Sequence, residues 1–195
     1  FLLESVNHND NNRYSILFAF PEKSIILYNF TDFNFLSELE DQYKSNNINT
    51  NLPFSGGWFV YLSYELIGQI EPILSKELCD SELPIAYAVK IPSAIIIDHK
   101  INTTYLIDQA GDQNRIDTIL ADIDRIKPIP EINVLGELDQ ENEDKFINGV
   151  KACLDYIVAG DVFQVNLSRE WQYNLTKEID SAIIYHALKS TNPAP

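Results

Sequence analysis

The 195-residue chain carries 14 Lys and Arg residues against 29 Asp and Glu residues, which gives it a formal net charge of −15. Nucleic-acid binding draws most of its affinity from clustered cations. Here the cations are scattered singly, so nucleic acid is disfavoured as a partner. Hydrophobic residues make up 45% of the sequence and charged residues 22%, proportions that are typical of a folded domain and exclude a disordered chain.

The two cysteines, Cys79 and Cys153, are too few for a disulfide framework, and neither has a neighbour at metal-ligand spacing. No apolar run approaches the roughly 18 residues that a membrane helix requires, and no signal segment opens the chain. These features predict a cytoplasmic protein without a membrane partner. The sequence holds no Met and runs from Phe1, inside an apolar run, to Pro195, inside a loop. We therefore expect it to be a piece of a longer protein.

The first part of the chain is predicted to form strands and a helix. Run 1–5 is joined by a polar loop to the β-branched and aromatic run 13–20, and a second such run follows at 23–30. This order predicts a hairpin-like entry and then two adjacent strands. Thr31 is expected to cap an amphipathic helix that ends near Asn46, because apolar residues recur there at helical spacing.

The middle of the chain is again rich in strands. A glycine pair precedes run 58–65, in which both alternating faces are largely apolar, and this predicts a strand covered on both sides. Residues 85–98 and 100–108 are expected to form another pair of strands, followed by a helix at 114–127. Prolines and a glycine within 128–139 then predict a linker.

The last part of the chain is expected to hold two helices and a strand. A helix at 141–159 should stop at Gly160, the usual position of a terminating glycine. Residues 161–171 alternate apolar and polar side chains, which predicts a strand with one apolar face, and 177–190 predicts a final helix. Because helices do not alternate regularly with single strands, the order of elements favours an α+β fold over a doubly wound sheet.

Standard catalytic motifs are absent from the sequence, and the three histidines have no spacing that suggests a ligand set. One polar cluster near the amino terminus is suited to an amino-acid zwitterion. Glu4 would accept from its ammonium, and Arg13 or Ser15 would bind its carboxylate. An intrastrand salt bridge is the alternative interpretation of the same residues.

Two further clusters have a functional and a structural interpretation. Residues 192–195 form an Asn-Pro-Ala-Pro segment, which is either part of a site or simply a turn after a helix. The polar side of 161–171 is either functional or a solvent-exposed face.

Four sequence blocks occur in the order seen in the chorismate-utilising component I enzymes, which include anthranilate synthase and aminodeoxychorismate synthase. The blocks are FLLES with NRYSI, PFSGGWFVYLSYEL, YIVAGDVFQVNLSREW and ALKSTNPAP. The resemblance spans nearly the whole chain. Asn166 in the third block resembles the aminodeoxychorismate branch more than the anthranilate branch. Anthranilate synthase component I and a non-catalytic, tryptophan-binding regulatory module remain the alternatives.

This resemblance implies an α+β fold, a sandwich of mixed or antiparallel β-sheets with flanking helices. It also implies two regions along the chain. Residues 1–130 would form the N-terminal region that is similar to anthranilate synthase component I. Residues 140–195 would begin a chorismate-binding region that is incomplete in this sequence.

The resemblance further implies a tryptophan-binding pocket between the sheets. In anthranilate synthases this pocket is the feedback site, whereas in the aminodeoxychorismate relatives the bound tryptophan is structural. The implied pocket residues are Glu4, Ser5, Asn11, Asn12, Arg13, Tyr14 and Pro195.

The implied reaction of the parent enzyme joins chorismate with ammonia in the presence of Mg²⁺. A glutamine amidotransferase partner delivers the ammonia, and the product, 4-amino-4-deoxychorismate, leads to p-aminobenzoate and folate. The family's nucleophilic lysine, general acid and metal-binding glutamates belong to segments after the NPAP motif. We therefore expect no catalytic residue and no Mg²⁺ ligand within 1–195, and no activity from these residues alone.

Overall fold

The computed structural model describes residues 1–4, 12–43, 50–74, 82–130 and 136–191. The chain divides into two compact units, the first spanning Phe1–Lys127 and the second beginning at Pro128. Among the helices in the described ranges, none has the length and apolar character needed to cross a membrane.

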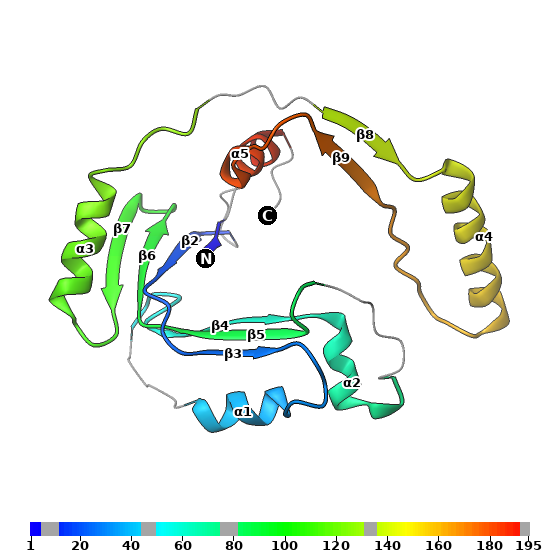
Figure 1. The fold of residues 1–195 in the computed structure, drawn as a ribbon, viewed down its shortest axis with the longest axis horizontal. Coiled ribbons are helices and arrows are strands. Elements are labelled where there is room, and N and C mark those ends of the chain that lie inside the picture. Colours follow the sequence, from blue (N-terminus) through cyan, green and yellow to red (C-terminus); the bar gives the residue numbers. More distant parts are fainter. Residues whose placement is uncertain (5–11, 44–49, 75–81, 131–135, 192–195) are drawn as a thin grey trace. The chain divides into compact units, whose positions relative to one another are not determined.

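The first unit contains an antiparallel sheet of four strands in the order β1-β2-β6-β7 (Figure 1). Leu2 pairs with Leu17, so the predicted hairpin between run 1–5 and run 13–20 is confirmed. The predicted pairing around residues 98–100 is confirmed as well, because β6 and β7 are antiparallel neighbours. The strands are β1 Leu2–Leu3, β2 Tyr14–Ala19, β6 Ser93–Asp98 and β7 Thr103–Asp108.

A second antiparallel sheet in this unit has the order β3-β5-β4, with β5 in the centre. Its strands are β3 Ser24–Leu27, β4 Gly57–Leu62 and β5 Ala86–Ile91. One buried cluster joins the two sheets, since Phe18 of β2 and Ile96 of β6 pack with Val89 of β5. The described part of the unit is therefore an α+β structure in which two antiparallel sheets share a core.

Two expectations about strand pairing are wrong. β2 and β3 are not adjacent, because β2 pairs with β6 and β3 pairs with β5 in the other sheet. The predicted strand at 85–98 is in fact two strands, β5 and β6, which also belong to different sheets. The chain changes sheet next to Phe20, which has a positive φ of 53°, and at Pro92, which has no N–H to donate to a ladder.

Helix α1, Phe35–Gln42, begins later than predicted, and its cap is Asn34 rather than Thr31. The Asn34 side chain accepts a hydrogen bond from the N–H of Ser37 at 2.9 Å. A distant residue also fixes this helix start, because the Gln69 amide accepts from the N–H of Phe35 at 3.0 Å. Sequence periodicity could not reveal that tertiary contact.

Replacing Asn34 with alanine is expected to lower the free energy of unfolding by about 1 kcal/mol, because one N–H of the first turn loses its acceptor. Urea denaturation followed by circular dichroism measures this loss. Thr31→Ala is the matched control, since Thr31 is exposed, and it should change stability by less than about 0.5 kcal/mol. A larger loss in Thr31→Ala than in Asn34→Ala would contradict the assignment of the cap.

The first unit has further helical segments in its described residues. Helix α3 starts one residue earlier and ends four residues earlier than predicted, and Asp112 caps it by accepting from the N–H of Asn114 at 2.9 Å. These segments are η1 Tyr64–Leu66, α2 Ile67–Ile70, η2 Pro72–Leu74 and α3 Gln113–Ile123.

The second unit contains a two-stranded antiparallel sheet, β8-β9, and two helices. Helix α4 ends at Gly160, which has a left-handed φ of 83°, so this predicted helix end is confirmed. The elements are β8 Gly136–Gln140, α4 Glu143–Ala159, β9 Trp171–Leu175 and α5 Ser181–Thr191.

The predicted strand at 161–171 is wrong, because the strand of this region is Trp171–Leu175 and residues 161–170 join no ladder. Alternation describes a strand only where a neighbour supplies hydrogen-bond partners, and β8 pairs with β9 instead. Phe163, on the apolar side of the predicted strand, is fully exposed. The alternating pattern therefore did not predict which residues of this region join a sheet.

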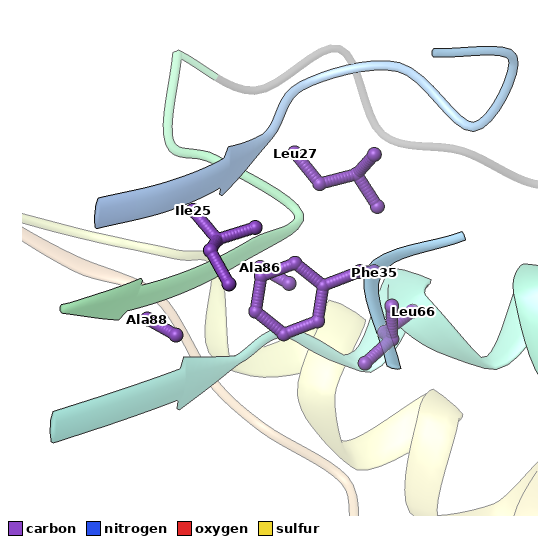
Figure 2. Close-up of a cluster of buried hydrophobic side chains, with 6 residues drawn as sticks. All are labelled: Ile25, Leu27, Phe35, Leu66, Ala86 and Ala88. Carbon is purple, nitrogen blue, oxygen red and sulfur yellow. The ribbon is translucent and has the colours of Figure 1, made fainter. Parts of the chain in front are cut away.

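A second buried cluster lies between α1 and the β3-β5-β4 sheet (Figure 2). Phe35 reaches from α1 toward Ala86 and Ala88, whose small side chains on the central strand leave room for its ring. Strand β4 is covered less than predicted, since Val60 is 40% exposed and Leu62 is 50% exposed at this edge of the sheet.

Candidate functional site

The predicted amino-acid site falls at one end of the β1-β2-β6-β7 sheet. Leu3 of β1 pairs with Ile16 of β2. Because these strands are antiparallel, Glu4, which follows β1, lies at the same end of the sheet as Arg13, which precedes β2. Asn12 and Tyr14 lie beside Arg13 in the chain. Of the other predicted residues, Ser5, Asn11 and Pro195 lie outside the described residues.

Arg13 is held by a carboxylate that the sequence analysis did not select. Asp98, at the end of β6, faces Tyr14 across the strand pair. Its Oδ1 accepts from Arg13 Nε at 2.9 Å, and its Oδ2 accepts from Arg13 Nη2 at 2.5 Å. The Arg13 guanidinium carbon also lies 4.8 Å from the centre of the Tyr14 ring. An ion pair does form at Arg13, but it joins two strands rather than neighbours within one.

Burial and hydrogen bonding fix the charge of this pair. The side chain of Asp98 is only 1% exposed, yet the guanidinium of Arg13 lowers the pKa of its carboxyl group. The backbone N–H of Lys100 adds a further hydrogen bond at 3.1 Å, and together these donors outweigh the desolvation of the carboxylate. The same pairing raises the pKa of Arg13, so both groups stay charged at neutral pH.

Ser15, the other residue considered for a ligand carboxylate, is 4% exposed on β2. Its hydroxyl oxygen lies 2.8 Å from Nε2 of His99. The backbone N–H of His99 also donates to the backbone carbonyl of Arg13 at 2.9 Å, and this bond holds His99 at this end of the sheet. The structure therefore brings Arg13, Ser15, Asp98 and His99 together. The sequence could have revealed the last two only if the β2-β6 register had been known.

A second polar cluster connects α3 to the same sheet. Asp108, at the end of β7, accepts from Arg115 Nε at 2.7 Å and from the Ser93 hydroxyl at 2.5 Å. The N–H groups of Ala110 and Asp112 also donate to it, at 3.0 and 2.8 Å. Burial opposes ionisation of this carboxylate, but these hydrogen bonds prevail and hold the pKa of Asp108 well below its usual range. This cluster joins elements of the fold and was missed by the sequence analysis.

The acidic side chains of the described residues are not gathered into a metal-binding cluster. Across these ranges, no group of three or more His, Cys, Asp or Glu side chains has an arrangement that could hold a metal ion. Asp139, Glu141 and Glu170 line a depression of about 210 Å³ in the second unit, but they do not form such a group. We therefore assign none of these residues to Mg²⁺ and derive no step through the metal.

Comparison with known proteins gives consistent results. The family model described as chorismate binding enzyme matches residues 1–195. The chain is 30% identical over 203 residues to the anthranilate synthase component I-like protein of Synechocystis sp., which covers 98% of this chain and 41% of that protein. It is 30% identical over 155 residues to the aminodeoxychorismate synthase component 1 of Bacillus subtilis, and this alignment covers 73% of this chain and 32% of that protein. It is 28% identical to the anthranilate synthase component 1 of Thermus thermophilus, and this alignment covers 100% of this chain and 46% of that protein.

The fold has a solved counterpart. The structure matches anthranilate synthase component I from Streptococcus pneumoniae with a TM-score of 0.71 at 21% sequence identity, covering 98% of this chain and 48% of that one. This similarity confirms the predicted α+β fold. The chain spans less than half the length of each of these relatives. Because the family model extends over all of residues 1–195, the chain belongs to the chorismate binding enzyme family.

Proposed function

We propose that the protein containing this chain aminates chorismate, as component I of aminodeoxychorismate synthase. The observation that carries the proposal is the family match over residues 1–195, supported by relatives named for two synthases of this kind. Ammonia from a glutamine amidotransferase partner replaces the C4 hydroxyl group of chorismate, which leaves as water. In the full-length enzyme, bound Mg²⁺ would supply Lewis-acid chemistry. The numbered "component" in the names of the relatives is consistent with a second subunit.

Two branches of this chemistry differ in their products. Asn166 favours the aminodeoxychorismate branch, whose product keeps the enolpyruvyl group and leads to p-aminobenzoate and folate. The second candidate is anthranilate synthase component I. It is favoured by relatives that carry this name and match nearly the whole chain, such as the Thermus protein with 100% of this chain covered.

Product analysis of the full-length protein with chorismate, ammonium chloride and magnesium chloride separates the two candidates. An aromatic product such as anthranilate forms only when the ring loses its enolpyruvyl group as pyruvate. We therefore expect consumption of chorismate without pyruvate release. Pyruvate released in equal amount to the chorismate consumed, together with an aminated aromatic product, would instead establish the anthranilate candidate. Residues 1–195 alone, as a control, should show no turnover.

We also propose that tryptophan binds at the end of the first sheet, near Glu4, Asn12, Arg13 and Tyr14. Glu4 accepts a hydrogen bond from the amino group of tryptophan. Asp98 orients the guanidinium of Arg13 next to the bound ligand. Calorimetry of the full-length protein with tryptophan tests this site. Ser5→Ala should weaken binding, whereas Ser37→Ala, an exposed control on α1, should not. Equal affinities in the two variants would exclude a role for Ser5.

A further inference from the structure

A cavity of about 420 Å³ opens at one end of the β3-β5-β4 sheet, within the first unit. Its polar lining includes Lys23, Lys90 and Gln109, and its aromatic lining includes Tyr43 and Trp58. None of these five residues belongs to the amino-acid site proposed above. The cavity therefore needs an explanation of its own.

The backbone brings the two lysines together. The N–H of Lys90 donates to the carbonyl of Lys23 at 2.9 Å, and the N–H of Glu22 donates to the carbonyl of Lys90 at 2.8 Å. Two residues just before β3, Glu22 and Lys23, thus oppose one residue of β5, Lys90, which is the arrangement of a β-bulge. On the other side of Lys90, Trp58 is its direct partner on β4. The two ammonium groups and the indole therefore come from neighbouring positions, with Lys23 just before β3, Lys90 on β5 and Trp58 on β4.

The charges around this cavity favour an anion. Two lysines and one carboxylate, Glu22, line it. Glu22 is already shared, because its Oε2 lies 3.4 Å from Lys90 Nζ and its Oε1 lies 3.3 Å from Arg115 Nη1. The lining carries a net positive charge in a protein with a net charge of −15. Like charges at neighbouring positions repel each other, and an anion between the two lysines would offset that repulsion.

The aromatic walls favour a flat ring next to the anionic group. Trp58 packs against the buried cluster between α1 and the β3-β5-β4 sheet, and this packing fixes the position of its indole ring. Tyr43, just after α1, is 62% exposed. Such rings offer large apolar surfaces for stacking, while a few polar groups set the orientation of a ligand. Gln109 supplies an amide on the same wall. Its position is constrained by Gly56, where a Cβ would lie 2.8 Å from Gln109 Cβ.

We propose that this cavity binds a small aromatic carboxylate. The carboxylate lies between the ammonium groups of Lys23 and Lys90, and the ring lies against Trp58. This site goes beyond the proposed amination of chorismate and does not depend on it, because no group in the cavity is assigned to that reaction.

Titration calorimetry of the full-length protein with benzoate tests the proposal. Benzoate is expected to bind saturably at millimolar concentration, and cyclohexanecarboxylate and benzyl alcohol should each bind more weakly. The first lacks the aromatic ring and the second lacks the charge. Lys23→Gln combined with Lys90→Gln should weaken benzoate binding by about tenfold or more. Trp58→Leu should also weaken it, whereas Lys127→Gln, at an exposed lysine outside the cavity, should leave the affinity unchanged.

Two controls keep the outcome interpretable. Lys23→Arg combined with Lys90→Arg keeps both charges and should retain binding, and circular dichroism verifies that each variant is folded. Absence of saturable benzoate binding, or equal affinity in the wild type and the glutamine variant, would overturn the proposal. Chorismate turnover is measured separately without benzoate, so failure of this site and failure of the amination proposal are distinguishable.

Discussion

Replacing Phe35 with alanine is expected to lower the free energy of unfolding by about 3 to 5 kcal/mol. Phe35 is completely buried, and its ring fills the space between α1 and the small residues Ala86 and Ala88 (Figure 2). Alanine would remove that contact and leave a cavity that the β5 backbone cannot close, because β5 is paired on both sides. Urea denaturation followed by circular dichroism measures the change.

The neighbouring substitution Leu36→Ala provides the control. Leu36 lies on the same helix but is 40% exposed, so its removal should cost no more than about 1 kcal/mol. Phe35→Leu fills part of the space and keeps the test usable if the alanine variant does not fold. Equal losses for Phe35→Ala and Leu36→Ala would show that the cluster in Figure 2 does not stabilise the fold as described.

Asp108→Asn is expected to lower the free energy of unfolding by about 2 to 3 kcal/mol at neutral pH. The substitution removes the charge that accepts from Arg115, Ser93 and two backbone N–H groups. We take a modest value because the Arg115 side chain is 21% exposed and retains contact with solvent. Asp122→Asn is the matched control. Its carboxylate pairs with Arg125 at the surface, where such pairs contribute little.

The same variant gives a pH test. The folded-state pKa of Asp108 lies below its ordinary value of 3.8, so the carboxylate contributes stability above that value and loses the contribution as pH falls further. The difference in stability between wild type and Asp108→Asn should therefore stay constant from about pH 7 to pH 5 and shrink below about pH 4. A difference that grew on acidification would contradict the assigned direction of the pKa shift.

The sequence predicted local structure better than pairing. The helix that ends at Gly160 and the hairpin of the first two strands depend on nearby residues, and both are confirmed. The predicted runs 13–20 and 23–30 also contain strands, β2 and β3. The second neighbour of β2, which is β6, and the neighbour of β3, which is β5, come from residues 86–98, far along the chain. Alternation of side chains carries no information on such partners, which is also why the strand expected at 161–171 was wrong.

The candidate site shows the same limit. Arg13 and Ser15 were selected from the sequence because their side chains suit a ligand carboxylate. Their partners in the structure, Asp98 and His99, lie more than 80 positions away and become neighbours only through the β2-β6 register. The motif resemblance recovered the family because it depends on the order of residues along the chain rather than on those contacts.

Mass spectrometry of the reaction catalysed by the full-length protein tests the central claim most directly. The protein is incubated with chorismate, isotopically labelled ammonium and magnesium chloride, and the products are compared with a reaction that lacks the protein. Amination predicts that the chorismate consumed appears as a product carrying the nitrogen label. A nitrogen-free product, or a folded protein that leaves chorismate unchanged, would contradict the proposed function.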